Sequence, residues 1–255
     1  MPDYRRTPTF DLSGKRALVV GASSGIGQAS ALALAEHGAE VTLAARRVEK
    51  LVELADHMKG ENWIARVLEL DVVDVAATAI AVENTGPFDI LLNAAGKAKH
   101  TKSTETTLED FDAVMNINLK GAYFLTQAVA KGLLAAGKSG SLINISSQMA
   151  HVGGRERAVY CASKHAVEGF NKAMAIEFGP SKIRVNTICP TFILTPLTQP
   201  TFDDPEKRAW VLDKIKLGRA GEVEDIMGAV VYLASDASAL VTGTSLMIDG
   251  GWTAD

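Results

Sequence analysis

Short apolar runs alternate with longer segments of helical period along most of this chain, and this alternation limits the folds open to it. The apolar runs are rich in β-branched residues and predict strands at 16–20, 40–45, 63–70, 89–93, 141–146, 184–188 and 245–249. Helical periodicity falls between them, near 26–36, 48–58, 74–82, 107–136, 158–178 and 222–234. Strands joined by helices pair in parallel through right-handed crossovers. The pattern therefore predicts an α/β fold, a doubly wound parallel sheet with helices on both faces.

The length and composition favour one domain. The 255 residues are 47% hydrophobic and 22% charged, which suffices for a substantial buried core. We expect a single domain over 1–255, with 1–12 as an N-terminal extension. Lys and Arg are scattered through a chain of net charge −4, so nothing indicates nucleic-acid binding.

Cysteine usage and hydropathy indicate a compartment. Cys161 and Cys189 are too few for a disulfide framework and do not have the spacing of metal ligands, so we expect a reducing environment and no metal. No apolar stretch reaches a membrane-spanning length without charges, and the opening residues contain no apolar leader. We therefore expect a cytoplasmic protein with no membrane partner.

One long stretch departs from the alternation. Residues 190–205, PTFILTPLTQPTFDDP, carry prolines that prevent a continuous helix. Such a stretch is either a mobile flap over a binding site or an ordinary long loop, and the residues favour neither. We take 190–215 as a candidate substrate flap.

The first predicted strand runs directly into a glycine loop, VVGASSGIG at 19–27. Gly21, Gly25 and Gly27 lie between a strand and a helix start, where missing side chains let backbone N–H groups and the positive helix end approach a pyrophosphate. Placed after the first strand of an alternating pattern, this spacing predicts a dinucleotide site. Close packing of helix on strand, with no ligand, is the alternative.

A second motif lies on a predicted helix, where Tyr160 and Lys164 are four residues apart. This spacing places both side chains on one helix face. A nearby ammonium favours the phenolate and brings the phenol, whose ordinary pKa is about 10, closer to a useful acid–base range. Taken alone, the pair has an alternative interpretation, in which both side chains lie on an exposed helix face and have no catalytic role.

Several further motifs follow these two in a recognisable order. They are LNAAG at 92–96, NINLKG at 116–121, NISS at 144–147, YCASK at 160–164 and RVNTICP at 184–190. Together with the glycine loop they resemble the short-chain dehydrogenase/reductase family over nearly the whole chain. The resemblance implies a single Rossmann domain with a seven-stranded sheet, a nicotinamide cofactor, and interconversion of a carbonyl and an alcohol by hydride transfer.

The resemblance also implies catalytic roles. Tyr160 would give a proton to the carbonyl oxygen in reduction and take it back in oxidation, and Lys164 would lower its pKa and hold the nicotinamide ribose. Ser147 would hydrogen-bond the substrate oxygen, and Asn118 would help to hold a water for proton relay. This chemistry agrees with the residues themselves, because an oxygen that gains negative charge needs hydrogen-bond donors and a proton source.

Cofactor contacts carried over from the family come from the glycine loop, from strand ends and from the start of the irregular stretch. They are Gly21, Ser23, Ser24, Gly25, Ile26, Gly27, Asp71, Val72, Asn93, Ala94, Ala95, Gly96, Tyr160, Lys164, Pro190, Ile193 and Thr195. Asp71 is placed to reach the adenine ring, although an Asp after a strand often only caps a turn.

Three positions depart from the family pattern. Val20 replaces the usual Thr before the first glycine, Ala94 replaces an Asn, and Thr191 replaces the Gly that often follows the proline at position 190. Only the last is expected to reshape the nicotinamide side of the pocket. The remaining details look most like the branch of tetrameric carbonyl and xylulose reductases, so we expect a homotetramer.

The end of the second predicted strand indicates the cofactor. Sites that prefer NAD place Asp or Glu here to bind the adenosine ribose, whereas this chain has Ala45 followed by Arg46 and Arg47. The missing carboxylate removes a repulsion from a 2′-phosphate, and the planar fork of Arg46 suits a bidentate contact with it. Arg47 adds positive field or faces solvent, and Ser23 adds one hydrogen bond. NADP is therefore favoured over NAD, with a solvated helix start as the alternative.

The predicted function is an NADP(H)-dependent oxidoreductase acting on a small carbonyl or alcohol. Sugars, sugar acids, small dicarbonyls and 3-oxoacyl compounds all remain open as substrates. A catalytically idle sensor of the cofactor would need the glycines but not Ser147, Tyr160 and Lys164 together, and a structural protein would need neither set.

Overall fold

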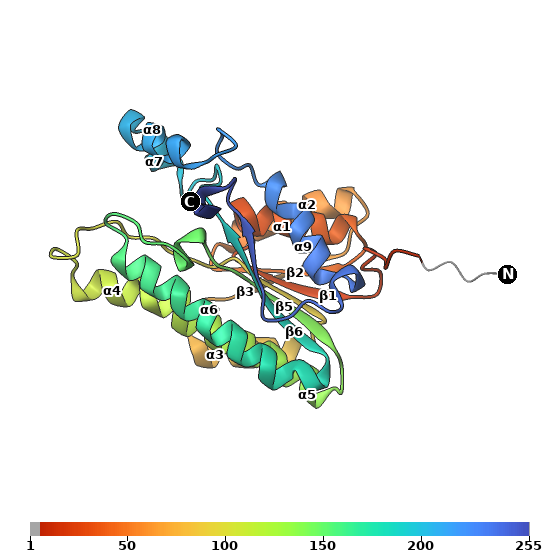
Figure 1. The fold of residues 1–255 in the computed structure, drawn as a ribbon. Coiled ribbons are helices and arrows are strands. Elements are labelled where there is room, and N and C mark those ends of the chain that lie inside the picture. The colour runs from red at the N-terminus through yellow and green to blue at the C-terminus, as the bar shows by residue number, and fades with distance from the viewer. Residues whose placement is uncertain (1–5, 255) are drawn as a thin grey trace.

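The structure, a computed structural model, describes residues 6–254 and contains a seven-stranded sheet of parallel pairs (Figure 1). The strands are β1 (Arg16–Val20), β2 (Glu40–Ala45), β3 (Ala65–Glu69), β4 (Ile90–Asn93), β5 (Gly140–Ile145), β6 (Ile183–Pro190) and β7 (Ser245–Ile248). Across the sheet they run in the order β3-β2-β1-β4-β5-β6-β7. From β1 the chain adds β2 and β3 on one side, and it then returns to the other side of β1 and adds β4 to β7 in order. This reversal confirms the doubly wound class.

Helices cover both faces of the sheet (Figure 1). On one face lie α1 (Gly25–Glu36), α2 (Val48–Gly60) and α9 (Glu224–Ala234), and on the other lie α3 (Val75–Thr85), α5 (Ala122–Ala135) and α6 (Ala158–Phe178). Side chains of a strand alternate between the two faces. In β1, Ala17 and Val19 join the first core cluster, whereas Leu18 and Val20 join the second. Burial on both faces explains why the strands read as continuous apolar runs.

Most element bounds agree with the predicted ones. β1, β2 and α6 occupy 16–20, 40–45 and 158–178 as predicted. The predicted strand 63–70 shortens to β3, which lies at the sheet edge and pairs only with β2. The predicted strand 184–188 lengthens to β6, because β5 and β7 pair with it on its two sides.

The predicted helix 107–136 is wrong as one continuous element. The chain there forms α4 (Leu108–Met115), a π-helical segment (Asn116–Gly121) and α5. Gly121 packs so closely on Val72 that an added Cβ would lie 2.9 Å from its side chain. Wide turns of this kind are common beside functional sites. Short 3₁₀ turns lie at Gln148–Ala150, Gly179–Ser181, Asp236–Ser238 and Trp252–Ala254.

The stretch 190–215 contains two helices, α7 (Gln199–Phe202) and α8 (Pro205–Lys214). The helices are separate, as the prolines predicted. The sequence reasoning missed α8, although Asp204 before Pro205 is a start signal, and the Asp204 carboxylate accepts hydrogen bonds from the N–H groups of Glu206 and Lys207. Apolar side chains fasten the stretch in a third cluster made of Met149, Phe192, Val211, Ile215 and Trp252.

Within residues 6–254, no helix combines the length and the apolar character that crossing a bilayer would require.

Candidate active site

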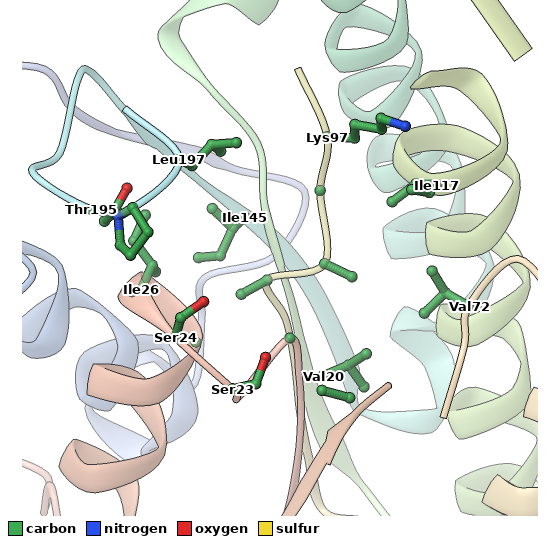
Figure 2. Close-up of a pocket in the computed structure, with 18 of the residues that line it drawn as sticks. Val20, Ser23, Ser24, Ile26, Val72, Lys97, Ile117, Ile145, Thr195 and Leu197 are labelled. Atoms are coloured by element: carbon green, nitrogen blue, oxygen red, sulfur yellow. The ribbon is translucent and has the colours of Figure 1, made fainter. Parts of the chain in front are cut away.

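The C-terminal ends of the strands surround a cleft of about 490 Å³. Its walls include the loops after β1 and β4, the neighbours between which the chain changes direction along the sheet. Doubly wound sheets place their ligands at this position. In Figure 2, Ser23, Ser24 and Ile26 of the glycine loop lie toward one side of the cleft, and Val72 and Ile117 lie across from them.

The cleft gathers most of the predicted site residues. Those that line it are Gly21, Ser23, Ser24, Gly25, Ile26, Gly27, Arg46, Arg47, Asp71, Val72, Ala94, Ala95, Gly96, Ser147, Tyr160, Lys164, Pro190, Ile193 and Thr195. Leu197 and Thr198, which also line the cleft, belong to the candidate substrate flap 190–215, and Lys97 follows the LNAAG motif directly. Lining residues that the sequence did not indicate include Leu70, Ile117 and Ile145, which are apolar positions outside any motif.

The glycine loop has no space for side chains. An added Cβ on Gly21 would lie 2.8 Å from the Ala94 carbonyl carbon, and one on Gly27 would lie 2.3 Å from the Gly21 oxygen. Gly21 also has φ +83°, a conformation that favours glycine. Ser24 is the N-cap of α1 but makes no side-chain cap bond, so the first N–H groups of the helix point toward the cleft without a cap.

Two predicted polar residues face inward instead of lining the cleft. Asn93 is buried, and its amide donates to Asn144 Oδ1 while its oxygen accepts from the Ala95 N–H. Its side chain therefore shapes the loop after β4, and contact of Asn93 with the cofactor stays a prediction. Asn118 is buried in the π-helical segment, where it exchanges two hydrogen bonds with the Lys97 backbone and donates to Ser163 Oγ. These partners engage its whole amide, and its part in a water relay stays a prediction.

Ser147, Tyr160 and Lys164 come together at one end of the cleft. Tyr160 lies in the first turn of α6, and the Lys164 ammonium one turn later lies 5.8 Å from the centre of its ring. The ammonium donates to the Ile145 carbonyl oxygen over 2.8 Å, which fixes it to the end of β5. The Ser147 hydroxyl accepts from the Met149 N–H and donates to Gln148 Oε1.

Burial governs the ionisation of Tyr160 and Lys164. It raises the pKa of the Tyr160 phenol, and the Ser147 hydroxyl and the Arg157 guanidinium act in the opposite direction. Burial also lowers the pKa of Lys164 to about 8, which Cys189 and Glu168 partly oppose. Desolvation of the phenol therefore outweighs the groups that lower its pKa, and a lowering by Lys164 stays a prediction. The Lys164 ammonium is directed to the Ile145 carbonyl.

Arg47, rather than Arg46, contacts the glycine loop. Its Nη2 donates to Ser23 Oγ over 2.8 Å and to Ser24 Oγ over 3.0 Å, while both arginines line the cleft. The expectation that Arg47 only adds field or faces solvent is therefore incomplete. Asp71 also lines the cleft, and its carboxylate accepts from the Val73 N–H as a turn cap would.

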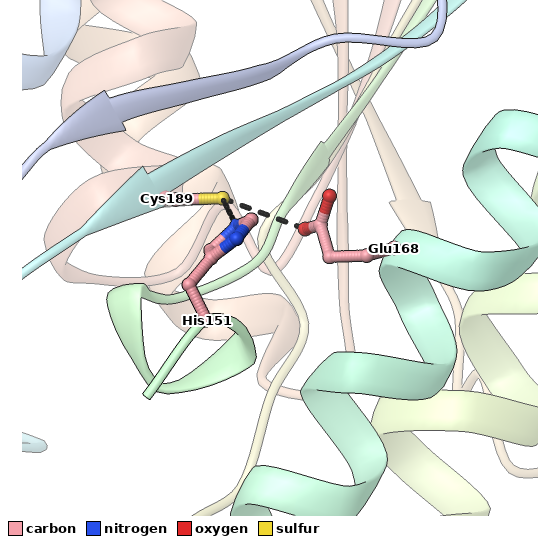
Figure 3. Close-up of side chains that lie close together, drawn as sticks. All are labelled: His151, Glu168 and Cys189. Atoms are coloured by element: carbon pink, nitrogen blue, oxygen red, sulfur yellow. Dashed lines mark hydrogen bonds between the residues drawn. The ribbon is translucent and has the colours of Figure 1, made fainter. Parts of the chain in front are cut away.

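His151, Glu168 and Cys189, none of which lines the cleft, lie close together (Figure 3). The Cys189 thiol donates to Glu168 Oε1 over 3.4 Å and lies 3.6 Å from His151 Nε2. Hydroxyls of Thr187 and Ser245 donate to the other Glu168 oxygen. Burial and the Glu168 charge raise the pKa of Cys189 to about 12, so the thiol stays protonated. We interpret the group as a hydrogen-bond network that joins α6 to β6 and β7, a link that the sequence spacing did not reveal.

Comparisons with known proteins agree with this geometry. Residues 21–253 match a family model described as Enoyl-(Acyl carrier protein) reductase. The chain is 39% identical over 243 residues to an L-xylulose reductase of Mus musculus, covering 95% of this chain and 98% of that protein. It is 42% identical over 250 residues to a D-threitol dehydrogenase of Mycolicibacterium smegmatis, covering 96% and 95%.

A solved structure extends the likeness to three dimensions. It is that of a putative 2-deoxy-D-gluconate 3-dehydrogenase from Agrobacterium tumefaciens with bound NADP, with a TM-score of 0.93 and 42% identity. The match covers 98% of this chain and 100% of that one. The order of motifs, the sheet topology and these similarities all cover nearly the same residues. The chain belongs to the short-chain dehydrogenase/reductase family of oxidoreductases.

Proposed function

We propose that this oxidoreductase uses NADP(H) to interconvert a ketone and a secondary alcohol on a small polar compound, with Tyr160 as acid and base. The observation that carries the proposal is that Ser147, Tyr160 and Lys164 share one continuous cleft with the glycine loop. The named relatives act on L-xylulose and D-threitol, and the similar solved structure contains NADP. These names favour the sugar, polyol and sugar-acid end of the range of substrates left open by the sequence.

The cleft residues fit a dinucleotide phosphate. Gly21 and Gly27 leave a cradle that a Cβ would fill, and the uncapped start of α1 offers N–H groups to a pyrophosphate. At the end of β2, Ala45 supplies no carboxylate, and Arg46 and Arg47 both border the cleft. A 2′-phosphate therefore meets positive charge and no repulsion here.

The chain's own residues handle the proton. When bound, NADPH supplies the hydride that reaches the carbonyl carbon. Tyr160 then donates its phenolic proton to the carbonyl oxygen, and its raised pKa keeps that proton in place at neutral pH. Ser147 turns its hydroxyl hydrogen from Gln148 to the same oxygen and stabilises the negative charge that develops there. Lys164 holds the Tyr160 side of the site to the end of β5.

The test is removal of the proton donor. Tyr160→Phe keeps the ring, so we expect turnover to fall by about 10²- to 10⁴-fold while the Kd for NADPH changes little. Lys164→Ala is expected to damage both turnover and cofactor binding. The measurement follows absorbance of the reduced nicotinamide against a panel of sugars, polyols, sugar acids and dicarbonyls.

Tyr232→Phe is the matched control, because Tyr232 lies on α9 and packs against the core away from the cleft. Near-normal turnover in Tyr160→Phe would contradict the proposed role. A wild-type protein that binds NADPH but turns over no member of the panel would favour the idle sensor instead.

A further inference from the structure

Arg157 is a buried cation beside the catalytic tyrosine. It is the N-cap residue of α6, three residues before Tyr160, and the residue is only 9% exposed. The side chain passes over Gly154, where an added Cβ would lie 2.8 Å from Arg157 Cδ. Its guanidinium lies 5.1 Å from the centre of the Phe192 ring, and Nη1 contacts Nε2 of His100.

This buried charge forms no ion pair, although the charge of the neighbouring exposed residue Glu156 acts on it. Among the ion pairs formed by residues 6–254, none includes Arg157, and its buried Nε makes no hydrogen bond. Burial, together with the Arg157 charge, lowers the pKa of His100 to about 4, so the imidazole is neutral and accepts from Nη1. An unpaired cation away from water is costly, and an anion that reaches it recovers that cost.

The free edge of the guanidinium has a specific shape. Because Nη1 faces His100, the remaining edge is the Nε and Nη2 pair, which matches the two oxygens of a carboxylate. Phe192 shields one face of the group, and Phe202, Trp210 and Trp252 pack around Phe192. Lys97 lines the cleft, and at His100 the charge of Glu156 opposes those of Arg157 and Lys207. The guanidinium therefore borders a cluster of aromatic side chains, and the exposed Glu156 is an acid whose charge acts on it.

We infer that the substrate carries a carboxylate, which the Nε and Nη2 edge of Arg157 binds while the reacting carbon lies at Tyr160. The inference rests on the proposed function and selects sugar acids from its candidate substrates. Neutral sugars and polyols would leave the guanidinium unpaired. A single cation with one free edge also suits a carboxylate better than a phosphate monoester, which carries more charge and more acceptor oxygens.

The first experiment uses the wild-type protein. Aldonates of four to six carbons are assayed with NADP⁺ beside the alditol and the aldonamide of the same carbon skeleton. The amide keeps the shape of the carboxylate and removes its charge. We expect kcat/KM for the acid to exceed that for its amide and its alditol by on the order of 100-fold.

The second experiment changes the cation. Arg157→Gln is expected to reduce the acid-to-alditol ratio of kcat/KM by on the order of 100-fold, and Arg157→Lys, which keeps the charge but loses the bidentate edge, is expected to give an intermediate ratio. Arg155→Gln is the matched control, because Arg155 is an exposed arginine two residues away, and it should leave the ratio unchanged. The NADPH affinity of each variant reports whether the nucleotide site is intact.

The outcomes separate the two proposals. Wild-type turnover of alditols or aldonamides at a kcat/KM equal to or above that of the acids would overturn the inference, whether or not the variants fold. An unchanged ratio in a folded Arg157→Gln protein would overturn it as well. Absence of NADP⁺-dependent turnover across the whole panel would contradict the proposed function itself.

Discussion

Arg46 and Arg47 are adjacent in the sequence but differ in their contacts. Arg47 bridges to Ser23 and Ser24 and so ties the end of β2 to the glycine loop, while Arg46 borders the cleft with no hydrogen bond to the described residues. Arg46 is therefore free to meet a phosphate, and Arg47 holds the serines that would meet it from the other side. Ala45, the last residue of β2, leaves the ribose position without a carboxylate.

The two arginines make a prediction at the residue scale. A charge-assisted contact with a 2′-phosphate contributes about 1.5–3 kcal/mol, so Arg46→Ala should raise the Kd for NADPH on the order of 10- to 100-fold and leave NADH binding nearly unchanged. Arg47→Ala should weaken the binding of both NADPH and NADH, because it also removes the hydrogen bonds that hold Ser23 and Ser24 of the glycine loop. Fluorescence titration of NADPH and NADH measures both constants.

Arg66→Ala serves as the control, since Arg66 is an exposed arginine on β3 that pairs with Glu40 outside the cleft. Ala45→Asp should oppose the phosphate and shift preference toward NADH. Wild-type protein that bound NADH as tightly as NADPH would show that the arginine pair has been misinterpreted.

The first strand, loop and helix act as one element. α1 approaches β1 closely because Gly27 presents only hydrogen to the Gly21 carbonyl, and the same approach directs the helix N-terminus at the cleft. Ala31, Leu34 and Ala35 of α1 then bury against the first core cluster. Packing and cofactor binding therefore depend on the same glycine. The two interpretations of the loop made from the sequence, a dinucleotide site and close packing of helix on strand, are compatible with each other.

At the element scale, Gly27→Ala should both destabilise the fold and weaken the binding of NADPH. The new Cβ would lie 2.3 Å from the Gly21 oxygen, so strand and helix must separate. We expect a loss of about 1–3 kcal/mol of unfolding free energy and a clear rise in the Kd for NADPH. Urea denaturation and cofactor titration measure the two effects.

Gly60→Ala is the matched control, because Gly60 ends α2 with open space around it. Alanine there should be neutral or stabilise by up to about 1 kcal/mol. A Gly27→Ala protein with wild-type stability and NADPH affinity would mean that the loop does not hold the helix start in place.

For the molecule as a whole, apolar side chains remain exposed on the layer that contains α4, α5 and α6. They are Leu108, Phe111, Tyr123, Phe124, Leu134 and Ile176, and Ile176 is 79% exposed. Large apolar side chains that stay exposed on one layer are typical of interaction sites when they form a patch. From the likeness to tetrameric reductases expected on the sequence, we predict that the partner is another copy of this chain.

We predict a homotetramer with two-fold symmetry that buries α5 and α6. Light scattering at micromolar concentration should return four times the chain mass of 27.0 kDa. Ile176→Glu should lower that mass, because a charge on an apolar interface is left desolvated. Val52→Glu, an exposed apolar position of α2 on the opposite face of the sheet, should not. A monomer mass for the wild-type protein would remove the idea.

The sequence alone determined much about this protein. Strands 16–20 and 40–45 and helix 158–178 were predicted to the residue, because their periodicity and turn residues are local properties of the chain. The glycine loop and the Tyr160–Lys164 pair are local as well, since each depends on spacing within a few residues.

Only the tertiary structure decided which way the polar side chains point. Asn93 turns inward because Asn144, on the neighbouring strand, supplies its partner, and Asn118 turns inward to the Lys97 backbone. Burial raises the pKa of Tyr160 and lowers that of Lys164, and this burial comes from the packing of the fold. The contact of Arg157 with His100 joins positions 57 residues apart. Such meetings arise when strands and helices pack, and because no local period encodes them, they follow from the fold.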